Sequence, residues 1–503
     1  MLLDLFDAAL IDRRDAPALD GVSLLRVHAG ASRVAARFAD LGVRRGDRVA
    51  IYCENRHGFV YSFLGALRLG AIAVPVNVLY RSADLAHVLS DAEPAIVVRS
   101  VAGARHLDDA GGAGTAVDAG EVEAWAADES LGSEIRRRGA RADDVAAIVY
   151  TSGTTGRSKG AMLTHANLAA AAAALMAAWR WRADDTLLLA LPLFHVHGLV
   201  AGLCTSLAAG SHVLLRERFD ARDVLATLRR GEVTAFFGVP TMYVRLLEAV
   251  AAGAEPPAPI RLYVSGSAPL STETFREFGV AFGAAILERY GATEFGFVLS
   301  NRYGGPRPAG SVGIPVPGAS VRIAQPGGAA PLEAGRIGEL LVRGPTVFAG
   351  YWRRPQDTAD AFVADGDGRR WYRSGDLARY DAEHDVYSIA GRIKELIITG
   401  GFNVYPREIE NAIEAFDGVR ACAVIGKPDA ARGELPVAFV EAEPPFDGAV
   451  VLDALRGRLA SFKIPKEIHV VDELPRNAMG KLDKPALRAR FEGTGGATPR
   501  QEG

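Results

Sequence analysis

Apolar and polar positions alternate along most of the chain in a way that predicts short strands separated by helices. Short runs of Val, Ile, Leu and Ala are typical of buried strands, and longer stretches rich in Ala, Leu and Arg are typical of helices. Residues 48–52, 59–68 and 71–74 give this order as strand, helix and strand. Because a helix between two strands favours their parallel pairing, the pattern predicts an α/β fold with largely parallel sheets.

The pattern changes towards the C-terminus, and the change predicts two domains. Strand-like runs at residues 339–343 and 386–390 indicate a β-rich portion, and a shorter unit of mixed pattern follows. We therefore expect an α/β protein with a large N-terminal domain, residues 1–391, and a small mobile α+β C-terminal domain, residues 392–492. The large domain is expected to hold mainly parallel β-sheets flanked by helices, plus the β-rich portion.

Three other stretches lack the alternating pattern. Residues 104–128 are rich in Ala, Gly and Asp and are predicted to form a loop, and residues 493–503 are predicted to be a disordered tail. The apolar stretch 187–209 is interrupted by Pro192 and two histidines, so it does not reach the ~18 uninterrupted apolar residues of a membrane span. It is predicted to be buried core, and we expect no membrane partner.

Composition and charge exclude several classes of function. The chain has 503 residues, of which 49% are hydrophobic, enough for a large core in more than one domain. A net charge of −3 without a long run of one sign argues against a nucleic-acid partner. Asp4 and Asp7 interrupt the apolar N-terminal stretch, so we expect no signal peptide and a cytoplasmic location. The three cysteines are scattered, which indicates neither a disulfide framework nor a zinc site.

The run YTSGTTGRSKG at residues 150–160 is the strongest chemical signal in the sequence. Backbone N–H groups of a Gly-rich turn, hydroxyl groups and one lysine supply donors and positive charge to a polyphosphate. Only two residues separate Gly153 from Gly156, so the run is not a Walker A loop. An apolar run at 145–149 and a helical pattern at 168–179 predict the order strand, loop and helix of a phosphate site. A flexible surface loop is the alternative.

Lysine usage singles out a few positions. The chain has 7 lysines among 57 basic residues, and Lys159 is the only lysine before residue 390. Lysine is a compact charge on a flexible stem that the planar arginine fork does not replace, so Lys159, Lys394 and Lys481 are candidates for chemistry. The other four are expected to be ordinary surface residues: Lys427, Lys463, Lys466 and Lys484.

Seven segments together resemble the adenylate-forming acyl-CoA synthetase family, over essentially the whole chain and in the order of that family. They are YTSGTTGRSKG, LPLFHVHG (191–198), YVSGSAPL (263–270), ERYGATE (288–294), YRSGDL (372–377), GRIKELIITGGFNVYPREIE (391–410) and PRNAMGK (475–481). The resemblance implies a reaction in two steps, in which a carboxylate attacks the α-phosphate of ATP and CoA thiol then displaces AMP. It implies ATP, Mg²⁺ and CoA as cofactor or co-substrates and a small-molecule carboxylic acid as partner.

The resemblance also implies roles for individual residues. Those expected at ATP are Thr151, Ser152, Gly153, Thr154, Thr155, Gly156, Lys159, Gly266, Ser267, Ala268, Pro269, Glu288, Arg289, Tyr290, Gly291, Asp376 and Arg392. Those expected to be catalytic are Lys481, Thr293, Glu294 and His195, with Thr155 and Glu294 at Mg²⁺. Those expected at the hinge and on the CoA path are Lys394, Gly400, Gly401 and Phe402.

Lys481 lies on the small domain, which must close over ATP for the lysine to reach the reacting centre. The resemblance implies that the same domain then rotates to present another face for CoA. A lysine acetyltransferase acting on Lys481 would remove its charge. His195 is expected to gate the acyl pocket and His197 to be structural, because two histidines alone make a poor metal site. Whether the protein is a monomer or a homodimer stays open.

The choice of acid depends on two arginines. Arg245 and Arg289 lie in segments that border the acyl pocket in the family, and a guanidinium is the usual partner of a second carboxylate. The sequence around them is similar to that of malonyl-CoA synthetases, including those that accept methylmalonate. Ala292, where malonate enzymes often have Met, would widen the pocket, and the phenylalanines at 295 and 297 could line an apolar site. A medium-chain or aryl acid-CoA ligase and a ligase that loads a carrier protein remain alternatives. The 503 residues show no fused carrier or condensation segment, which favours free CoA as the acceptor.

Overall fold

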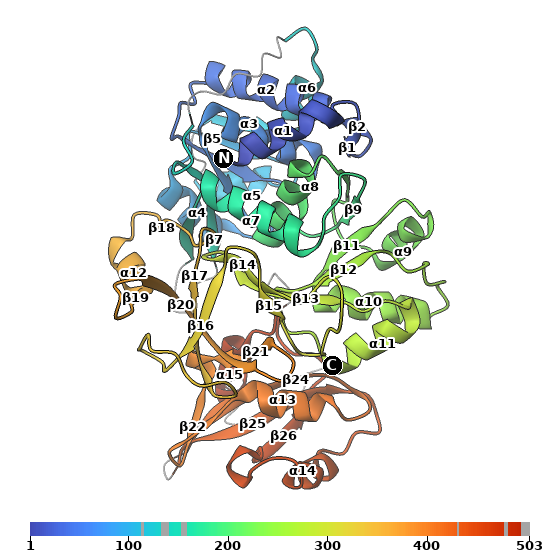
Figure 1. The fold of residues 1–503 in the computed structure, drawn as a ribbon, viewed down its shortest axis with the longest axis vertical. Helices are drawn as coiled ribbons and strands as arrows, with labels where there is room; N and C mark the ends of the chain where they lie inside the picture. The colour runs from blue at the N-terminus through green and yellow to red at the C-terminus, as the bar shows by residue number, and fades with distance from the viewer. Residues whose placement is uncertain (112–114, 132–139, 152–157, 430–431, 477–480, 494–503) are drawn as a thin grey trace.

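The computed structural model describes all residues except 112–114, 132–139, 152–157, 430–431, 477–480 and 494–503 (Figure 1). The predicted tail therefore lies almost entirely outside the described residues. The fold prediction is confirmed: a large N-terminal domain of parallel and mixed sheets is followed by a small C-terminal domain. In Figure 1 the C-terminal domain, orange to red, lies at the lower end of the view, beyond the β-rich portion.

The first sheet has seven strands within the described part of the chain, in the order β18-β8-β7-β4-β3-β5-β6. Their bounds are β3 (Arg48–Tyr52), β4 (Ile72–Pro75), β5 (Ile96–Arg99), β6 (Thr115–Asp118), β7 (Val145–Thr151), β8 (Lys159–Thr164) and β18 (Gly350–Tyr351). Strands β3 to β7 are parallel, and β8 and β18 are antiparallel. The helices that pack on its two faces are α2 (Leu24–Asp40), α3 (His57–Leu69) and α6 (Ala119–Ala127) on one, and α4 (Ser82–Ala92) and α5 (Ala104–Asp109) on the other.

The second sheet has nine strands among the described residues, in the order β15-β14-β13-β12-β11-β9-β10-β1-β2. Their bounds are β1 (Pro17–Leu19), β2 (Val22–Ser23), β9 (Thr186–Leu189), β10 (His212–Leu215), β11 (Ala235–Gly238), β12 (Leu262–Ser265), β13 (Leu287–Ala292), β14 (Gly296–Ser300) and β15 (Ile314–Pro315). The associated helices are α1 (Leu2–Arg13), α7 (His165–Ala178), the π-helix η1 (His197–Cys204), α8 (Thr205–Ala208), α9 (Ala221–Arg229), α10 (Pro240–Ala251) and α11 (Thr272–Phe282).

Both faces of the second sheet are buried, and alternate residues of its strands face different cores. In β11, Phe237 packs into the large core shared with the first sheet, and Phe236 packs into the core under α9, α10 and α11. In β9, Leu187 and Leu189 pack into the large core, and Leu188 packs into the core under the three helices. This is the continuous apolar run expected of a parallel strand covered on both sides. The predicted buried core at 187–209 is thus confirmed, since η1 is buried throughout.

The β-rich portion and the C-terminal domain complete the chain. The first is an antiparallel sheet of β16 (Ser320–Ala324), β17 (Ile337–Arg343), β19 (Phe362–Ala364), β20 (Arg370–Asp381) and β21 (Val386–Arg392), with α12 (Pro355–Asp360) beside it. The second contains η2 (Ile393–Glu395), β22 (Ile397–Thr399), β23 (Phe402–Val404), α13 (Pro406–Glu414), β24 (Val419–Asp429), β25 (Gly433–Ala442), α14 (Gly448–Arg456), η3 (Ser461–Lys463), β26 (Glu467–Val470) and α15 (Lys484–Gly493). No helix in the described ranges is both long enough and apolar enough to cross a bilayer.

Two local predictions are wrong. The stretch 104–128 was predicted to be a loop, but outside residues 112–114 it contains α5, β6 and α6, because Val117 and Val122 pack into the core. The Gly-rich run was predicted to lead directly into a helix, but β8 comes first and pairs antiparallel with β7. The run therefore connects two antiparallel strands, and β8 lies between it and α7.

Candidate active site

The carboxyl ends of four parallel strands bring the central motifs together. Strands β9, β11, β12 and β13 are neighbours, with Ser265 of β12 in register with Glu288 of β13. Gly266 and Ser267 follow β12, Arg289 and Tyr290 lie in the last part of β13, and the HVHG segment follows β9. Ligands bind beyond the carboxyl ends of the strands in open α/β sheets, so this edge is where a site is expected.

The guanidinium of Arg289 lies close to the backbone between β12 and α11. A Cβ atom on Gly266 would lie 2.5 Å from Cζ of Arg289, so any larger residue at position 266 would displace the guanidinium. The next residue, Ser267, has φ of +73°, a left-handed conformation that is costly for a residue with a side chain. Such strain is retained where the surrounding contacts determine it, and here it places the hydroxyl of Ser267 beside the guanidinium.

Arg289 is a buried cation without a carboxylate partner in the described structure. Its Nη2 donates a hydrogen bond to Oγ of Ser267 at 3.1 Å. The guanidinium lies over the ring of Phe297, with Cζ 4.7 Å from the ring centre. Its Nε has no hydrogen-bond partner among the described residues. Burial lowers the pKa of Arg289 to about 9, which shows how strongly this environment disfavours the charge. A buried charge without a counter-charge in the protein is expected to pair with an oppositely charged group of a ligand.

The two histidines of HVHG lie beside this arginine and are neutral. Burial, with the charges of Lys481 and Arg289, lowers the pKa of His195 to about 3. Burial and Arg289 also place the pKa of His197 well below its ordinary value. The ring of His197 stacks on Phe237 of β11 at 6.1 Å, and its Nδ1 lies 3.4 Å from Oγ of Ser267. His197 was predicted to be structural, yet it contacts a predicted site residue.

Asp376 of β20 connects the β-rich portion to β13 and to the start of the C-terminal domain. Its carboxylate accepts a hydrogen bond from the hydroxyl of Tyr290 at 2.5 Å and pairs with Nε of Arg392 at 3.2 Å. Burial raises the pKa of Asp376, and Arg392 and the Tyr290 hydroxyl oppose that effect. A buried carboxylate held from two sides is a suitable acceptor for a pair of hydroxyl groups, as the resemblance implies for ribose.

Glu294 and Thr293 follow β13 and form the next part of the site. The hydroxyl of Tyr351 donates to Glu294 at 3.1 Å, and burial raises the pKa of Glu294. Thr293 is buried. No group of three or more His, Cys, Asp or Glu able to hold a metal occurs in the described ranges. A single carboxylate fits Mg²⁺ that is bound mainly by substrate phosphates, because this ion keeps several oxygen ligands from water and phosphate.

The Gly-rich run is described only at its two ends. Ser152, Gly153, Thr154, Thr155 and Gly156 lie outside the described residues, and their predicted roles stay predictions. At the far end, Nζ of Lys159 pairs with Oδ1 of Asp357 at 2.5 Å and lies 5.3 Å from the ring centre of Tyr351. Because Tyr351 also contacts Glu294, Lys159 is connected to the same part of the site through one aromatic ring.

Lys481 of the C-terminal domain lies among the charges of the N-terminal domain. Burial lowers its pKa to about 8; Arg392 and Arg289 add to this effect, and Asp376 and Glu294 oppose it. The structure thus brings the predicted catalytic lysine from the small domain to the predicted ATP residues of the large one. Burial raises the pKa of Glu288, in β13, to about 8. The positive charge of Arg407, in the small domain, opposes this effect.

Lys484 was predicted to be an ordinary surface residue, and this prediction is wrong. Its Nζ pairs with Glu410 of α13 at 2.6 Å and with Glu395 of η2 at 3.3 Å, and its side chain is only 14% exposed. The pairs join the start of α15, three residues after Lys481, to the segment that follows Arg392. Only the folded C-terminal domain reveals this contact, since the three residues are far apart in sequence.

Some predicted residues lie away from this cluster. Arg245 is exposed on α10 and has no ion pair within the described structure, so nothing joins it to Arg289. Lys394, Gly400 and Gly401 are exposed on the C-terminal domain, and both glycines have positive φ. Phe402 beside them is 55% exposed and stacks on Phe462 at 4.5 Å. In this arrangement the predicted CoA face points to solvent.

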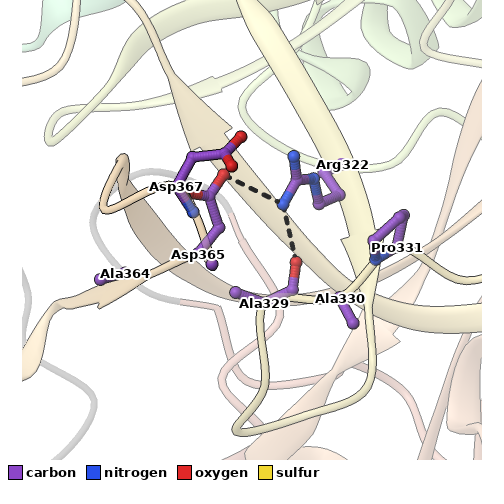
Figure 2. A pocket seen from close by; sticks show the side chains of 8 residues that line it. Arg322, Ala329, Ala330, Pro331, Ala364, Asp365 and Asp367 are labelled. Atoms are coloured by element: carbon purple, nitrogen blue, oxygen red, sulfur yellow. Dashed lines mark hydrogen bonds and ion pairs between the residues drawn. The ribbon is translucent and has the colours of Figure 1, made fainter.

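A separate hollow of about 390 Å³ lies on the β-rich portion (Figure 2). Arg322 reaches across it to the carbonyl of Ala329 at 2.8 Å and to the carboxylate of Asp365 at 3.4 Å. Asp365 also accepts from the ring N–H of Trp371. These charges are satisfied within the protein, and none of the predicted site residues lines the hollow, so we assign it no role.

Comparison with known proteins decides the family. The sequence model of the AMP-binding enzyme family matches residues 9–352, and that of the AMP-binding enzyme C-terminal domain matches residues 408–481. The chain belongs to the AMP-binding enzyme family. It is 36% identical over 473 residues to a feruloyl-CoA synthase from an Amycolatopsis species, covering 92% of this chain and 94% of that protein. It is 35% identical over 489 residues to the mitochondrial malonate–CoA ligase of Mus musculus, covering 89% and 82%.

Solved structures give the same family. ATP-bound MatB from Rhodopseudomonas palustris superposes with a TM-score of 0.88 at 40% identity, covering 98% of this chain and 99% of that one. The same enzyme in its apo form gives a TM-score of 0.79. The overall structure of this AMP-binding enzyme, of the CoA-ligase type, is thus more similar to the ATP-bound form of that relative than to its apo form.

Proposed function

We propose that the protein joins a short dicarboxylic acid, malonate or methylmalonate, to CoA at the expense of ATP, with AMP and pyrophosphate as the other products. The observation that carries the proposal is Arg289, a buried cation whose guanidinium finds no carboxylate among the described residues. An acid with one carboxylate uses that group in the reaction and leaves Arg289 uncompensated. A dicarboxylic acid supplies a second carboxylate, and a guanidinium is well suited to bind it.

The chain's own residues account for the first half-reaction. Thr293 and Lys481 would lie at the α-phosphate, where negative charge accumulates as the carboxylate attacks and pyrophosphate leaves. Asp376 would accept from the ribose hydroxyls, with Arg392 beside it, and the ring of Tyr290 would face the adenine. Glu294 would hold Mg²⁺, which neutralises phosphate charge when it is bound. His195, neutral and next to Lys481, would form the wall between the acid and the nucleotide.

The second half-reaction requires a different face of the C-terminal domain. The glycines at 400 and 401 and the ring of Phe402 are exposed in this arrangement, although the resemblance places them on the CoA path. Rotation of the domain about the segment after Arg392 would exchange Lys481 for that face. β21 ends at Arg392, and the separate core of the small domain starts at Ile397, so a domain boundary near 391/392 is our proposal.

An aryl acid is the second candidate, because one specific feature favours it. Ala292 is small and half-buried beside the buried ring of Phe297, and a feruloyl-CoA synthase is among the similar proteins. A flat aromatic acid could pack against such a ring, and Arg289 would then interact with its π system. Free CoA, and not a carrier protein, is proposed as the acceptor in either case.

The deciding experiment measures AMP release with ATP, Mg²⁺ and CoA across malonate, methylmalonate, acetate, octanoate, benzoate and ferulate. We expect malonate or methylmalonate to give the highest kcat/KM, at least ~10-fold above acetate. Among the acids tested, only these two supply a second carboxylate that can pair with Arg289. Omission of CoA, with pyrophosphate exchange as readout, isolates the first step. If ferulate or benzoate gives the highest value, the dicarboxylate proposal fails and the CoA-ligase assignment stands.

The pH dependence of the first step is a second test of the site. Lys481 has a pKa of about 8 in place of the ordinary ~10.4, so its positive charge is lost as the pH rises through about 8. Because kcat/KM reports the free enzyme, kcat/KM for ATP in pyrophosphate exchange is expected to fall to about half its plateau near pH 8. A profile that stays level up to about pH 9.5 contradicts an essential charge on Lys481 in this environment.

A further inference from the structure

Helix α4 is fixed against the first sheet and carries two polar side chains in line along one face. Its buried residues have the spacing of one apolar helix face: Leu85, Val88, Leu89 and Ala92. They pack into the core over β3, β4 and β7, and Figure 1 shows α4 beside β7. His87 and Asp91 are four residues apart, so they lie one turn apart on another face of the same helix. The helix therefore holds these two polar groups at a fixed separation.

The two side chains contact opposite ends of the Gly-rich run. Nε2 of His87 lies 2.8 Å from the backbone carbonyl oxygen of Ser158, the residue that precedes β8. The hydroxyl of Tyr150, near the end of β7, donates to Oδ2 of Asp91 at 2.7 Å. Because β7 and β8 pair with Tyr150 opposite Gly160, both contacts lie at the neck where the run leaves and rejoins the sheet. Both ends of the run are thus attached to one helix.

The contact between His87 and Ser158 has only one possible direction. A carbonyl oxygen can only accept, so a ring N–H at Nε2 of His87 donates to it. The imidazole also meets the ring of Tyr150 edge-on, with the ring centroids 6.3 Å apart and an interplanar angle of 83°. Packing and a hydrogen bond together orient this side chain, which is the arrangement expected of a residue that supports a binding site.

Asp91 also connects the helix to the segment that begins with β18, on the other side of β8. Its backbone carbonyl accepts a hydrogen bond from the ring N–H of Trp352 at 3.1 Å, and its Oδ1 lies 3.7 Å from Nη2 of Arg354. The backbone N–H of Trp352 in turn donates to the carbonyl of Gly160 at 2.8 Å. A shift of the neck relative to α4 would have to break several of these contacts at once.

We propose that His87 is a positioning residue for the phosphate chain of ATP: through the carbonyl of Ser158 it fixes the point at which the Gly-rich run returns to the sheet. Asp91 fixes the point at which the run leaves it. This role rests on the proposed function only in the use of ATP, and the choice of acid does not enter it. A site for a polyphosphate distinguishes ATP from AMP, so the effect of His87 is expected on the binding of ATP and not of AMP.

The test measures the dissociation constants of ATP and AMP, each with Mg²⁺, by calorimetry for the full-length parent and for His87→Phe. Phenylalanine keeps an aromatic ring against Tyr150 and removes the N–H donor. We expect ATP to bind roughly 3- to 10-fold more weakly, as for one lost hydrogen bond, and AMP to stay within about 2-fold. The KM for ATP in pyrophosphate exchange is expected to rise by the same factor. Thioester formation from supplied acyl-AMP, which has no β- or γ-phosphate, is expected to stay within about 2-fold.

Three further variants complete the test. His87→Gln keeps an N–H donor of similar reach and is expected to restore most of the affinity for ATP. His106→Phe is the matched control: it changes a half-buried histidine of α5, a helix in the same core, and leaves both polar contacts of α4 in place, so both constants are expected to stay within about 2-fold. Tyr150→Phe removes the hydrogen bond at the other end of the run, and is expected to weaken ATP binding by a factor similar to that of His87→Phe. It keeps the role testable if His87→Phe does not fold.

The outcomes separate this role from the proposed function. Equal losses of ATP and AMP affinity in His87→Phe would overturn the positioning role, because the change would then act on the whole nucleotide site or on the fold. Failure of His87→Gln to recover ATP binding would also overturn it, since the N–H donor would not be the group that matters. A parent enzyme that binds ATP but activates no dicarboxylic acid would overturn the proposed function alone.

Discussion

The change Lys481→Ala is expected to slow acyl-AMP formation by ~10²-fold or more, while thioester formation from supplied acyl-AMP and CoA stays within a few-fold of the parent. In the arrangement seen here, Lys481 reaches the large domain and lies among Arg392, Arg289, Asp376 and Glu294. Loss of a cation aimed at developing phosphate charge affects the step in which that charge develops. Pyrophosphate exchange measures the first step, and thiol consumption from supplied acyl-AMP measures the second.

Lys427→Ala is the matched control for this variant. Lys427 belongs to the same domain, is 37% exposed and pairs with Glu467, so its loss is expected to change neither half-reaction by more than about 2-fold. Equal losses of both half-reactions in Lys481→Ala would contradict the proposed rotation of the C-terminal domain between them, because Lys481 would then act at the reacting centre in both. Circular dichroism and thermal unfolding of both variants control for damage to the fold.

Arg289→Met is expected to lower kcat/KM for malonate by about 10²-fold and to leave acetate within about 3-fold. Removing one partner of a buried charge pair typically costs ~2–5 kcal/mol, which corresponds to a factor of roughly 30 to several thousand. The folded protein is not expected to suffer, because methionine replaces a buried charge that has no carboxylate partner in the described structure. We therefore expect an unchanged or higher Tm, which separates loss of binding from loss of fold.

Arg245→Met is the natural comparison for Arg289→Met. Arg245 is exposed on α10, and its loss is expected to be neutral for every acid if Arg289 alone binds the second carboxylate. A selective loss of malonate activity in both variants would place both arginines at the acid when substrate is bound. Neutral behaviour of Arg289→Met with malonate as the best substrate would remove the main support for the proposed site.

The sequence predicted the large features of the fold because they depend on local patterns. The apolar runs at 48–52 and 386–390 are strands, and the α/β class follows from their alternation with helices. The strand β8 was missed because KGAMLT carries no strong alternation and precedes an Ala-rich helix. The stretch 104–128 was missed because its short elements are rich in Ala and Gly, and burial against the first sheet outweighs their weak propensity.

The sequence predicted site residues only where they lie within a motif formed by one continuous segment. Asp376, Glu294 and Lys481 each lie in such a segment, and the structure brings their surroundings together. The contact of His197 with Ser267 joins residues 70 positions apart on two different strand ends. Register between β9, β11, β12 and β13 creates that contact, and a single sequence does not show register. The histidine alone, in an apolar run, is most often a packed core residue.

The arginine proposed to bind the acid and the lysine predicted to be catalytic belong to different domains, and this division has a consequence for engineering. Arg289 lies in β13 of the large domain, with Ser267 after β12 and His197 at the start of η1 beside it, whereas Lys481 is part of the small domain that we propose to begin near Arg392. A hybrid in which a relative's C-terminal domain is grafted at 392–397 would inherit its choice of acid from one parent. Its turnover rate would depend on the other.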